Sequence, residues 1–196
     1  MLIIKTPISC EEIRRMKVGE TFYVSGIIFT ARDMAHKRLK ELIEHGEEVS
    51  FNLDGGIIYH CGPIVRRLES GGWEVVAAGP TTSMRMESYE WLAIKNLGVK
   101  VVVGKGGMGE RTRDACKKYC AIYATYPGGA ALKAAKCIRE VESVYWSDLG
   151  SVEAVWKFRV EKFGPLIVVI DSNGNDLIEN VRRKSENRMK ELLKNI

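Results

Sequence analysis

The sequence predicts an α/β protein with a mixed sheet, in a three-layer or β/β/α arrangement. Between residues 21 and 137, short apolar runs alternate with helical patterns, an order typical of parallel strands joined by crossover helices. Beyond residue 138, three strand-like runs follow one another with short connections, which indicates a mixed sheet or a second small sheet. The 196 residues contain no repeat or linker and fit one domain spanning 1–196.

The N-terminal elements follow from residue types. Residues 1–20 indicate a short strand, a turn and a small helix. Residues 21–29 are β-branched and aromatic, which is typical of a strand. Thr30 is a suitable N-cap for a helix through His45, and Gly46 follows that helix as a stop signal.

The remaining elements follow the same rules. Residues 51–67 are Gly-rich, with a turn at 54–56 and a strand over 56–63 that runs into a loop. Further strands are expected over 73–78, 99–103, 121–125, 141–146, 154–160 and 166–170. Helices are expected over 84–97, 106–119 and 128–137, and a charged terminal helix from about residue 176.

Composition and charge exclude several classes of protein. Hydrophobic residues make up 45% and charged residues 28% of the chain, the balance of a soluble globular protein. The longest apolar runs are strand-sized and no signal peptide pattern opens the chain, so we expect a cytoplasmic protein without a membrane partner. The net charge is +5. Much of that excess lies in the last helix, where Lys and Arg alternate with Glu as on a solvated face. Nucleic-acid binding would require a larger unmixed basic patch with aromatics.

The five cysteines, at positions 10, 61, 116, 120 and 137, have neither the spacing of a disulfide framework nor that of a cluster-binding loop. Cys116 and Cys120 fall one helical turn apart. Free cysteines behave as small hydrophobic residues, so buried thiols are the preferred interpretation. We therefore expect no metal to be bound by this chain alone.

Three turns carry the chemistry that stands out most. Thr30-Ala31-Arg32, Thr81 to Arg85, and Gly104 to Gly107 each follow a strand-like run and place a cation where a helix should begin. A helix N-terminus favours anions, so the cations Arg32, Arg85 and Lys105 indicate an anionic ligand. In an open α/β sheet such turns meet at the carboxyl ends of the strands. The two arginines can each grip a carboxylate, and Lys105 adds a point charge.

Other polar residues have two interpretations. His36 lies four residues after Arg32, so it could act as a general base or orient Arg32. The His60-Cys61 pair resembles a structural strand end. Asp148 and Glu153 could form an acid/base pair, although turn and capping roles are commoner for such residues.

Five motifs together identify a family resemblance. They are His60-Cys-Gly-Pro63, Gly79-Pro-Thr-Thr-Ser-Met-Arg-Met86, Val103-Gly-Lys-Gly-Gly-Met108, Tyr126-Pro-Gly-Gly129 and Trp146-x-Asp-Leu-Gly150. In combination they resemble the β-subunit of class I fumarate hydratase and of the related L-tartrate dehydratase. The similarity covers essentially the whole chain.

The resemblance implies a swivelling β/β/α fold and an active site that two subunits share. In that family the α part carries a [4Fe-4S] cluster held by three cysteines, so the implied partner is a fumarase α-subunit, and a β-β dimer within an α2β2 assembly is plausible. The family's substrate contacts map onto Arg32, Arg85 and Lys105. Its proton-transferring threonine maps onto Thr81.

The implied reaction is the reversible addition of water to fumarate, giving L-malate. Arg85 and Lys105 would stabilise charge that builds on a carboxylate when the neighbouring proton leaves, while Arg32 orients the other carboxylate. Thr81 requires an activating partner, for which a carboxylate of the α-subunit is the candidate. Two alternatives stay open, namely L(+)-tartrate dehydration and a non-catalytic dicarboxylate-binding module.

Overall fold

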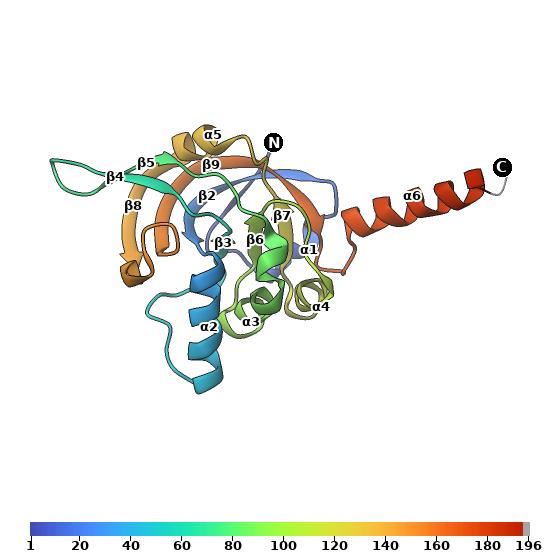
Figure 1. The fold of residues 1–196 in the computed structure, drawn as a ribbon, viewed down its shortest axis with the longest axis horizontal. Helices are drawn as coiled ribbons and strands as arrows, with labels where there is room; N and C mark the ends of the chain where they lie inside the picture. Colours follow the sequence, from blue (N-terminus) through green and yellow to red (C-terminus); the bar gives the residue numbers. More distant parts are fainter. Residues whose placement is uncertain (194–196) are drawn as a thin grey trace.

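The computed structural model describes residues 1–193, which form a mixed α/β fold around a seven-stranded sheet of order β1-β2-β3-β6-β7-β9-β8 (Figure 1). The strands are β1 (Leu2–Lys5), β2 (Thr21–Thr30), β3 (Ile57–Tyr59), β4 (Ile64–Arg67), β5 (Trp73–Ala77), β6 (Val101–Gly104), β7 (Ile122–Thr125), β8 (Ile138–Tyr145) and β9 (Val155–Ile170). The helices are α1 (Cys10–Arg15), α2 (Asp33–His45), α3 (Glu87–Leu97), α4 (Glu110–Tyr119), α5 (Ala131–Cys137) and α6 (Leu177–Leu193), with short 3₁₀ turns η1 (Ser83–Met86) and η2 (Ser147–Leu149).

The sheet closes on itself through β9. This strand runs antiparallel to β7 and β8 and also pairs with β2, so that β2, β3, β6, β7 and β9 form a small mixed five-stranded barrel. The strands β2, β3, β6 and β7 are parallel to one another. Their carboxyl ends therefore meet at one edge of the barrel. The expectation of an α/β fold with a mixed sheet is confirmed.

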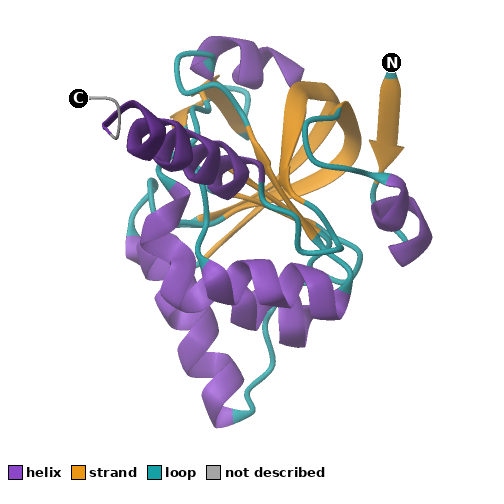
Figure 2. Cartoon of the chain, turned by 90° about the vertical axis from the view of Figure 1, so that its right-hand side faces the viewer, coloured by secondary structure: helices purple, strands orange, loops and turns teal. Residues whose placement is uncertain are grey.

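Alternation along the strands separates two hydrophobic cores. Ile57 and Tyr59 of β3 belong to one cluster, together with inward side chains from all five barrel strands, whereas Ile58 belongs to a second. This division follows from the two-residue period of a strand. The second cluster includes Ala35, Ala93 and Ala115 from α2, α3 and α4. These three helices lie together on one side of the sheet and α5 lies on the other (Figures 1 and 2).

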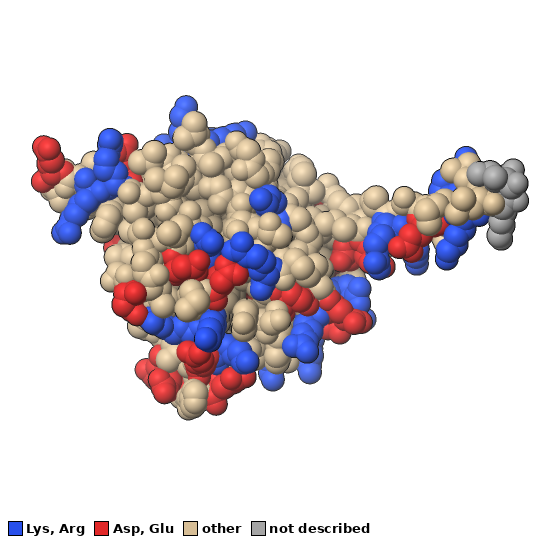
Figure 3. Space-filling model, in the orientation of Figure 1, with Lys and Arg blue, Asp and Glu red and all other residues tan. Residues whose placement is uncertain are grey.

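Helix α6 extends away from the barrel (Figure 1). None of its described residues is buried. Figure 3 shows basic and acidic side chains mixed along it and over the helical side of the molecule, which agrees with the expected solvated, charged helix. Within residues 1–193, no helix is both long and apolar enough to traverse a bilayer.

Several boundaries differ from the sequence-based expectation. The expected strands 154–160 and 166–170 are one strand, because the pairing with β2 resumes at Leu166 after Phe163, with an irregularity around Gly164. Its φ of 147° and the carbonyl oxygen of Phe22, 2.9 Å from where a Cβ would lie, require glycine there. Strand β4 was not expected. It pairs with β5 as a separate two-stranded sheet.

Thr30 is not the N-cap of α2, as predicted, but the last residue of β2. Its hydroxyl is buried and accepts a hydrogen bond from the Trp156 backbone N–H at 3.0 Å. The pairing of β2 with β9 continues to Phe29. The strand therefore includes Thr30, the residue that the sequence suggested as a helix cap. The cap position falls two residues later, on Arg32.

The interpretation of all five cysteines as thiols is wrong for two of them. Cys10 at the start of α1 and Cys120 at the end of α4 form a disulfide across 110 residues of sequence. Cys61 and Cys116 are buried free thiols, as expected, and Cys137 is half-buried. Spacing could not reveal the bridge, because it joins elements that only the tertiary fold brings together.

Replacing Cys10 by serine is expected to lower the free energy of unfolding by about 2–4 kcal/mol, the usual stabilisation from a cross-link that closes a long loop. The measurement is urea unfolding of the variant beside the wild type, with a free-thiol titration of each. Cys137→Ser, which breaks no bridge, serves as the matched control and should stay within about 1 kcal/mol of the wild type. Five titratable thiols in the unreduced wild type would contradict the bridge.

Candidate functional site at the carboxyl edge of the barrel

Two of the three predicted turns follow parallel strands that end at the same edge. Arg32 lies two residues after β2 and Lys105 directly follows β6. Between them, His60 follows β3 and donates its backbone N–H to the carbonyl of Val103 at 2.8 Å. The convergence expected from an open α/β sheet is therefore present at this edge.

The turn that carries Thr81 does not follow a strand of the barrel, contrary to the prediction. It follows β5, which belongs to the separate hairpin and not to the barrel. Hydrogen bonds bring it to the edge instead. The Thr81 N–H donates to the His60 carbonyl at 2.7 Å, and the Lys105 N–H donates to the Thr81 carbonyl at 3.2 Å. The backbone of Thr81 thus lies between the ends of β3 and β6.

Two carboxylates orient the two arginines. Asp33 accepts hydrogen bonds from Nε and Nη2 of Arg85, with 3.0 Å for the Nε contact. The Arg85 guanidinium lowers the pKa of Asp33, although partial burial opposes that effect. Arg32 Nε lies 3.3 Å from a carboxylate oxygen of Glu153. Among the described residues, no carboxylate contacts Nη1 of Arg32 or Nη1 of Arg85.

Glycines allow the cations to lie close to the backbone. A Cβ on Gly62 would lie 2.7 Å from Nη1 of Arg32, and a Cβ on Gly128 would lie 2.9 Å from Cδ of Lys105. At Gly62 a Cβ would also lie 2.6 Å from the main-chain oxygen of Val152, which excludes a side chain, whereas at Gly128 a Cβ would displace the stem of Lys105. The motifs around Gly62 and Gly128 therefore position Arg32 and Lys105 by providing bare main chain beneath them.

Lys105 does not begin a helix, contrary to the prediction. Helix α4 starts at Glu110 with Gly109 as its cap residue. The carboxylate of Glu87 occupies that N-terminus, accepting from the Gly109 N–H at 2.7 Å and from the Thr112 hydroxyl at 2.7 Å. An anion from α3 thus satisfies the free N–H groups, and Lys105 remains exposed in the preceding loop.

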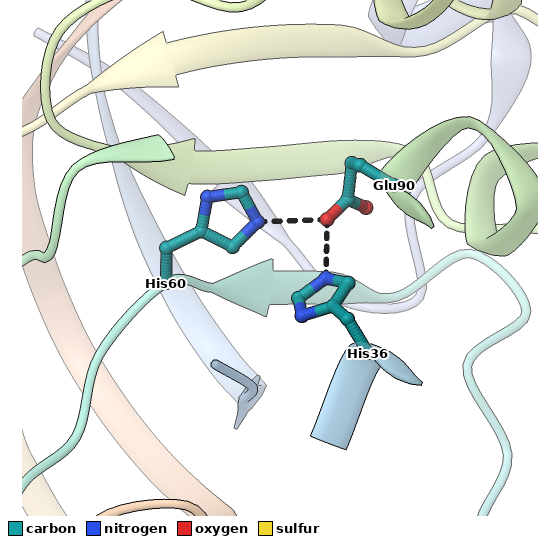
Figure 4. Close-up of side chains that lie close together, drawn as sticks. All are labelled: His36, His60 and Glu90. Atoms are coloured by element: carbon teal, nitrogen blue, oxygen red, sulfur yellow. Dashed lines mark hydrogen bonds and ion pairs between the residues drawn. The ribbon is translucent and has the colours of Figure 1, made fainter. Parts of the chain in front are cut away.

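A buried polar cluster lies beneath the edge. Nε2 of His36 on α2 and Nε2 of His60 contact the same oxygen of Glu90 on α3, Oε2, at 2.6 and 2.7 Å. Figure 4 shows both imidazole rings directed at this one oxygen. All three side chains are at most 1% exposed. Glu90 Oε1 makes no hydrogen bond with the described residues.

Ser83 extends this cluster to the turns. Its hydroxyl lies 2.9 Å from Nδ1 of His60 and accepts the backbone N–H of Lys105 at 3.2 Å. The Tyr123 hydroxyl lies 3.0 Å from the same oxygen. On the other side, Nδ1 of His36 lies 2.8 Å from the carbonyl oxygen of Arg32. A continuous polar chain therefore links Arg32 to Lys105.

The protonation states follow from burial and from the partners. Burial disfavours charge on Glu90, but His36 and His60 outweigh it and lower the Glu90 pKa to about 2. Burial also opposes charge on His36, where the Glu90 carboxylate outweighs it and raises the His36 pKa. For His60 burial prevails and lowers the pKa. The shifts thus favour the charged forms of Glu90 and His36 and the neutral form of His60.

The same cluster has the residue types of a metal site but not the spacing of one. Ligand atoms of His36, His60 and Glu90 lie within 4.8 Å of one another. Their contacts of 2.6 and 2.7 Å are hydrogen-bond lengths, whereas two ligands of a tetrahedral zinc ion stand roughly 3.3 Å apart. No comparable set among residues 1–193 contains a cysteine. The free thiols of the described chain therefore do not fit an iron–sulfur cluster.

The sequence analysis missed Glu90 and Ser83. A carboxylate on the buried face of α3, among Leu92, Ala93 and Ile94, was the available signal for Glu90, because an isolated charge on an apolar face needs a partner. Ser83 lies inside the predicted Thr81–Arg85 turn, in which only Thr81 and Arg85 were assigned a role. Of the two acidic candidates, Glu153 has the commoner capping role, accepting the Met34 N–H at 3.0 Å, and Asp148 pairs with Arg38.

Comparisons with known proteins agree with this architecture. The family model described as Fumarase C-terminus matches residues 2–181. The L(+)-tartrate dehydratase subunit beta of Escherichia coli (strain K12) is 46% identical over 187 residues, which cover 95% of this chain and 91% of that protein. A protein of Methanocaldococcus jannaschii named "Putative L(+)-tartrate dehydratase subunit beta" is 40% identical over 184 residues, 93% of this chain and 94% of that protein.

A longer relative carries a different name. The "Putative fumarate hydratase class I" of Geobacillus stearothermophilus is 44% identical over 185 residues, which cover 94% of this chain but 35% of that protein. The resemblance seen in the sequence motifs is confirmed, and the chain belongs to the Fumarase C-terminus family.

The buried cluster predicts a particular response to pH. In the wild type the raised pKa of His36 contributes stability that is fully present below pH 6.5 and is lost as the pH rises above that value. The lowered pKa of His60 has the opposite sign, so stability is lost as the pH falls below 6.5. Glu90 contributes stability above its unfolded pKa of 4.5, and this contribution is lost as the pH falls towards 2. The wild type is therefore expected to lose stability in two steps on acidification, first from His60 below pH 6.5 and then from Glu90 below pH 4.5.

In Glu90→Gln both imidazoles lose the neighbouring carboxylate, so burial lowers both pKa values. Stability is therefore expected to fall more steeply than in the wild type between pH 6.5 and 5, by roughly 1 kcal/mol or more. The measurement is urea unfolding at several pH values. Glu87→Gln removes the same charge but contacts no histidine, and should keep the wild-type profile. An identical profile for Glu90→Gln would show that the carboxylate is not the counter-ion.

Proposed function

We propose that this chain is the β-type subunit of a hydro-lyase that acts on a hydroxylated four-carbon dicarboxylate, with L(+)-tartrate as the leading substrate. The observation that carries the proposal is the meeting of Arg32, the Thr81–Arg85 turn and Lys105 at one edge of the barrel. The names of the relatives from E. coli and M. jannaschii support tartrate dehydration better than the fumarate hydration favoured from the sequence.

Fumarate hydration, giving L-malate, is the second candidate. The relative from G. stearothermophilus supports it, because its name refers to a class I fumarate hydratase. The two reactions share their chemistry. Each removes or adds a proton on a carbon beside a carboxylate and a hydroxyl on the neighbouring carbon, so the same cationic edge serves both.

In this proposal Arg32, Arg85 and Lys105 bind the two carboxylates. Loss of the carbon-bound proton builds negative charge on the adjacent carboxylate, and fixed cations that bind this charge lower the barrier. Asp33 and Glu153 hold the Nε side of the arginines. The Nη1 groups are then the donors directed to the substrate. Because these groups are already oriented, little reorganisation accompanies the reaction.

Thr81 is proposed to carry the proton. Its backbone is fixed at both N–H and C=O between His60 and Lys105, which places its hydroxyl among the three turns. An isolated hydroxyl is a weak base, so an activating group is required. We assign that group to a carboxylate of the partner subunit. His36, proposed from the sequence as catalytic or orienting, takes the orienting role because it is buried.

The partner is proposed to be an α-subunit, since two relatives are named as beta subunits. We assign the family's [4Fe-4S] cluster to that α-subunit, where it would act as a Lewis acid for the departing hydroxyl. Three further expectations stay predictions. They are a single swivelling β/β/α domain over 1–196, a β-β contact within an α2β2 assembly, and a cytoplasmic location.

The decisive experiment is reconstitution of this chain with its α-subunit, followed by assays on L(+)-tartrate, the other tartrates, L-malate and fumarate. We expect activity with the pair and none with this chain alone. Hydratase activity from the pure chain would refute the shared site. Micromolar binding of fumarate or tartrate to the isolated chain by calorimetry would instead favour a dicarboxylate-binding module.

Arg85→Ala in the reconstituted pair is expected to lower kcat/KM about 10²-fold or more, the effect of losing one electrostatic donor to developing charge. Arg66→Ala is the matched control, because Arg66 is an exposed arginine of the β4–β5 hairpin paired with Glu74. Steady-state kinetics should leave this control within about twofold of the wild type. Equal kinetics for the two variants would remove Arg85 from the site.

Neighbouring threonines allow a sharper test of the proton carrier. Thr81→Val is expected to lower kcat by roughly 10²-fold or more, because general acid–base transfer contributes about that much. Thr82→Val removes an exposed hydroxyl one residue away and should retain near-normal kcat. A primary isotope effect with C–²H substrate would accompany the loss in Thr81→Val. If both variants turn over normally, another group moves the proton.

A further inference from the structure

A buried polar chain runs beneath the three turns of the proposed site, from Arg32 through His36, Glu90, His60 and Ser83 to Lys105. We infer that Glu90 is a positioning residue of this site: by holding two histidines on one oxygen, it fixes the main chain that presents Arg32, Thr81 and Lys105. Only the link with catalysis rests on the proposed function. The positioning itself is a property of this polypeptide and can be measured without turnover.

The first arm of the chain fixes Arg32. The Arg32 carbonyl accepts the backbone N–H of His36 at 2.9 Å and also faces Nδ1 of the same histidine at 2.8 Å. Arg32 is the cap residue of α2 and has no side-chain capping bond. The imidazole of His36 contacts Glu90 on one side and the Arg32 carbonyl on the other, so it adds a second contact that fixes Arg32.

The second arm fixes Thr81 and Lys105. His60 accepts the Thr81 N–H on its carbonyl and faces the Ser83 hydroxyl with its ring. Ser83 in turn exchanges two contacts with Lys105, since its N–H donates to the Lys105 carbonyl at 3.0 Å and its hydroxyl accepts the Lys105 N–H at 3.2 Å. A Cβ on Gly104 would lie 1.8 Å from this hydroxyl oxygen, so glycine is required beside it.

The donors and acceptors around the two rings indicate the proton positions. His36 faces a carbonyl oxygen and a carboxylate oxygen, both of which accept, so both of its ring nitrogens carry protons. His60 faces the carboxylate with Nε2 and a hydroxyl with Nδ1, so Nε2 carries its proton and Ser83 donates to Nδ1. A buried imidazolium is stable only beside a negative charge, and Glu90 provides that charge.

The sharing of one oxygen connects the two arms. Both histidines bind Oε2, while Oε1 makes no hydrogen bond with the described residues. Because both contacts end on this one oxygen, α2 and the end of β3 meet at one point. A movement of α3 therefore shifts Arg32 and Lys105 together.

Nitrogen-15 spectroscopy of the imidazoles tests the inference directly, because the chain has three histidines and the third, His45, is exposed and acts as the reference. At pH 7 the wild type should show one ring protonated on both nitrogens, assigned to His36, and one protonated on Nε2 only, assigned to His60. In Glu90→Gln the doubly protonated signal should disappear. A neutral His36 in the wild type would overturn the inference.

Amide hydrogen exchange tests the positioning. In Glu90→Gln the amides of Thr81, Ser83 and Lys105 should exchange about tenfold faster relative to those of β9, the loss expected for about one weakened hydrogen bond. If that variant does not fold, Ser83→Ala removes only the last link and should still speed the exchange of Lys105. Ser88→Ala, an exposed serine on α3, is the control. Unchanged exchange at Ser83 and Lys105 would overturn the inference.

The link with catalysis is measured separately in the reconstituted pair. Ser83→Ala should lower kcat/KM about tenfold or more, because small displacements of substrate-binding groups reduce rates strongly, and Ser83→Thr should restore part of the loss. Ser88→Ala should remain within about twofold. If wild-type pairs turn over no dicarboxylate, the proposed function fails while the spectra and exchange rates still decide the positioning. If turnover is normal in Ser83→Ala, the network does not position the site.

Discussion

The buried contact between Glu90 and two histidines is the constraint on which the site depends. A carboxylate and an imidazolium fully removed from water are costly unless they face each other. This requirement fixes α2, α3 and the end of β3 relative to one another. The cations at the edge of the barrel are less buried, and Asp33 and Glu153 pair with the two arginines. The main chain that carries these cations is held by the buried cluster below it.

Closure of the sheet provides the frame for that contact. Strand β9 pairs with β2 on one side and β7 on the other, so the parallel strands β2, β3, β6 and β7 cannot splay apart. Their carboxyl ends then form a narrow rim. On this rim the ends of β3 and β6 lie close enough for the Thr81 segment to bridge them by backbone hydrogen bonds. The barrel and the polar cluster thus act on the same few residues.

An arrangement of this kind suits a site that two subunits complete. The arginines are half-neutralised by Asp33 and Glu153, which prevents the cations from repelling one another while the edge is open. Their Nη1 donors have no carboxylate partner among the described residues, so these donors stay available for a ligand. A dicarboxylate entering between the subunits would find the donors already oriented, and water would leave as the partner closes over it.

The sequence by itself determined the class of fold, the family and the identity of the exposed cations. Alternating strands and helices leave a periodic signature, and the glycines beside Arg32 and Lys105 belong to motifs that are read locally. It also placed His36 beside Arg32, because four residues make one helical turn. These features depend on neighbours in the chain, so they are visible in the order of residues.

Only the tertiary structure decided how those pieces meet. Glu90 lies 54 residues from His36 and 30 from His60, and the bridge from Cys10 to Cys120 spans 110. No local pattern encodes such pairs, because they arise when helices pack on a closed sheet. The late start of α4 has the same origin, since its N-terminus is satisfied by Glu87 from another helix. Local sequence specifies which groups are present, and long-range packing specifies which of them touch.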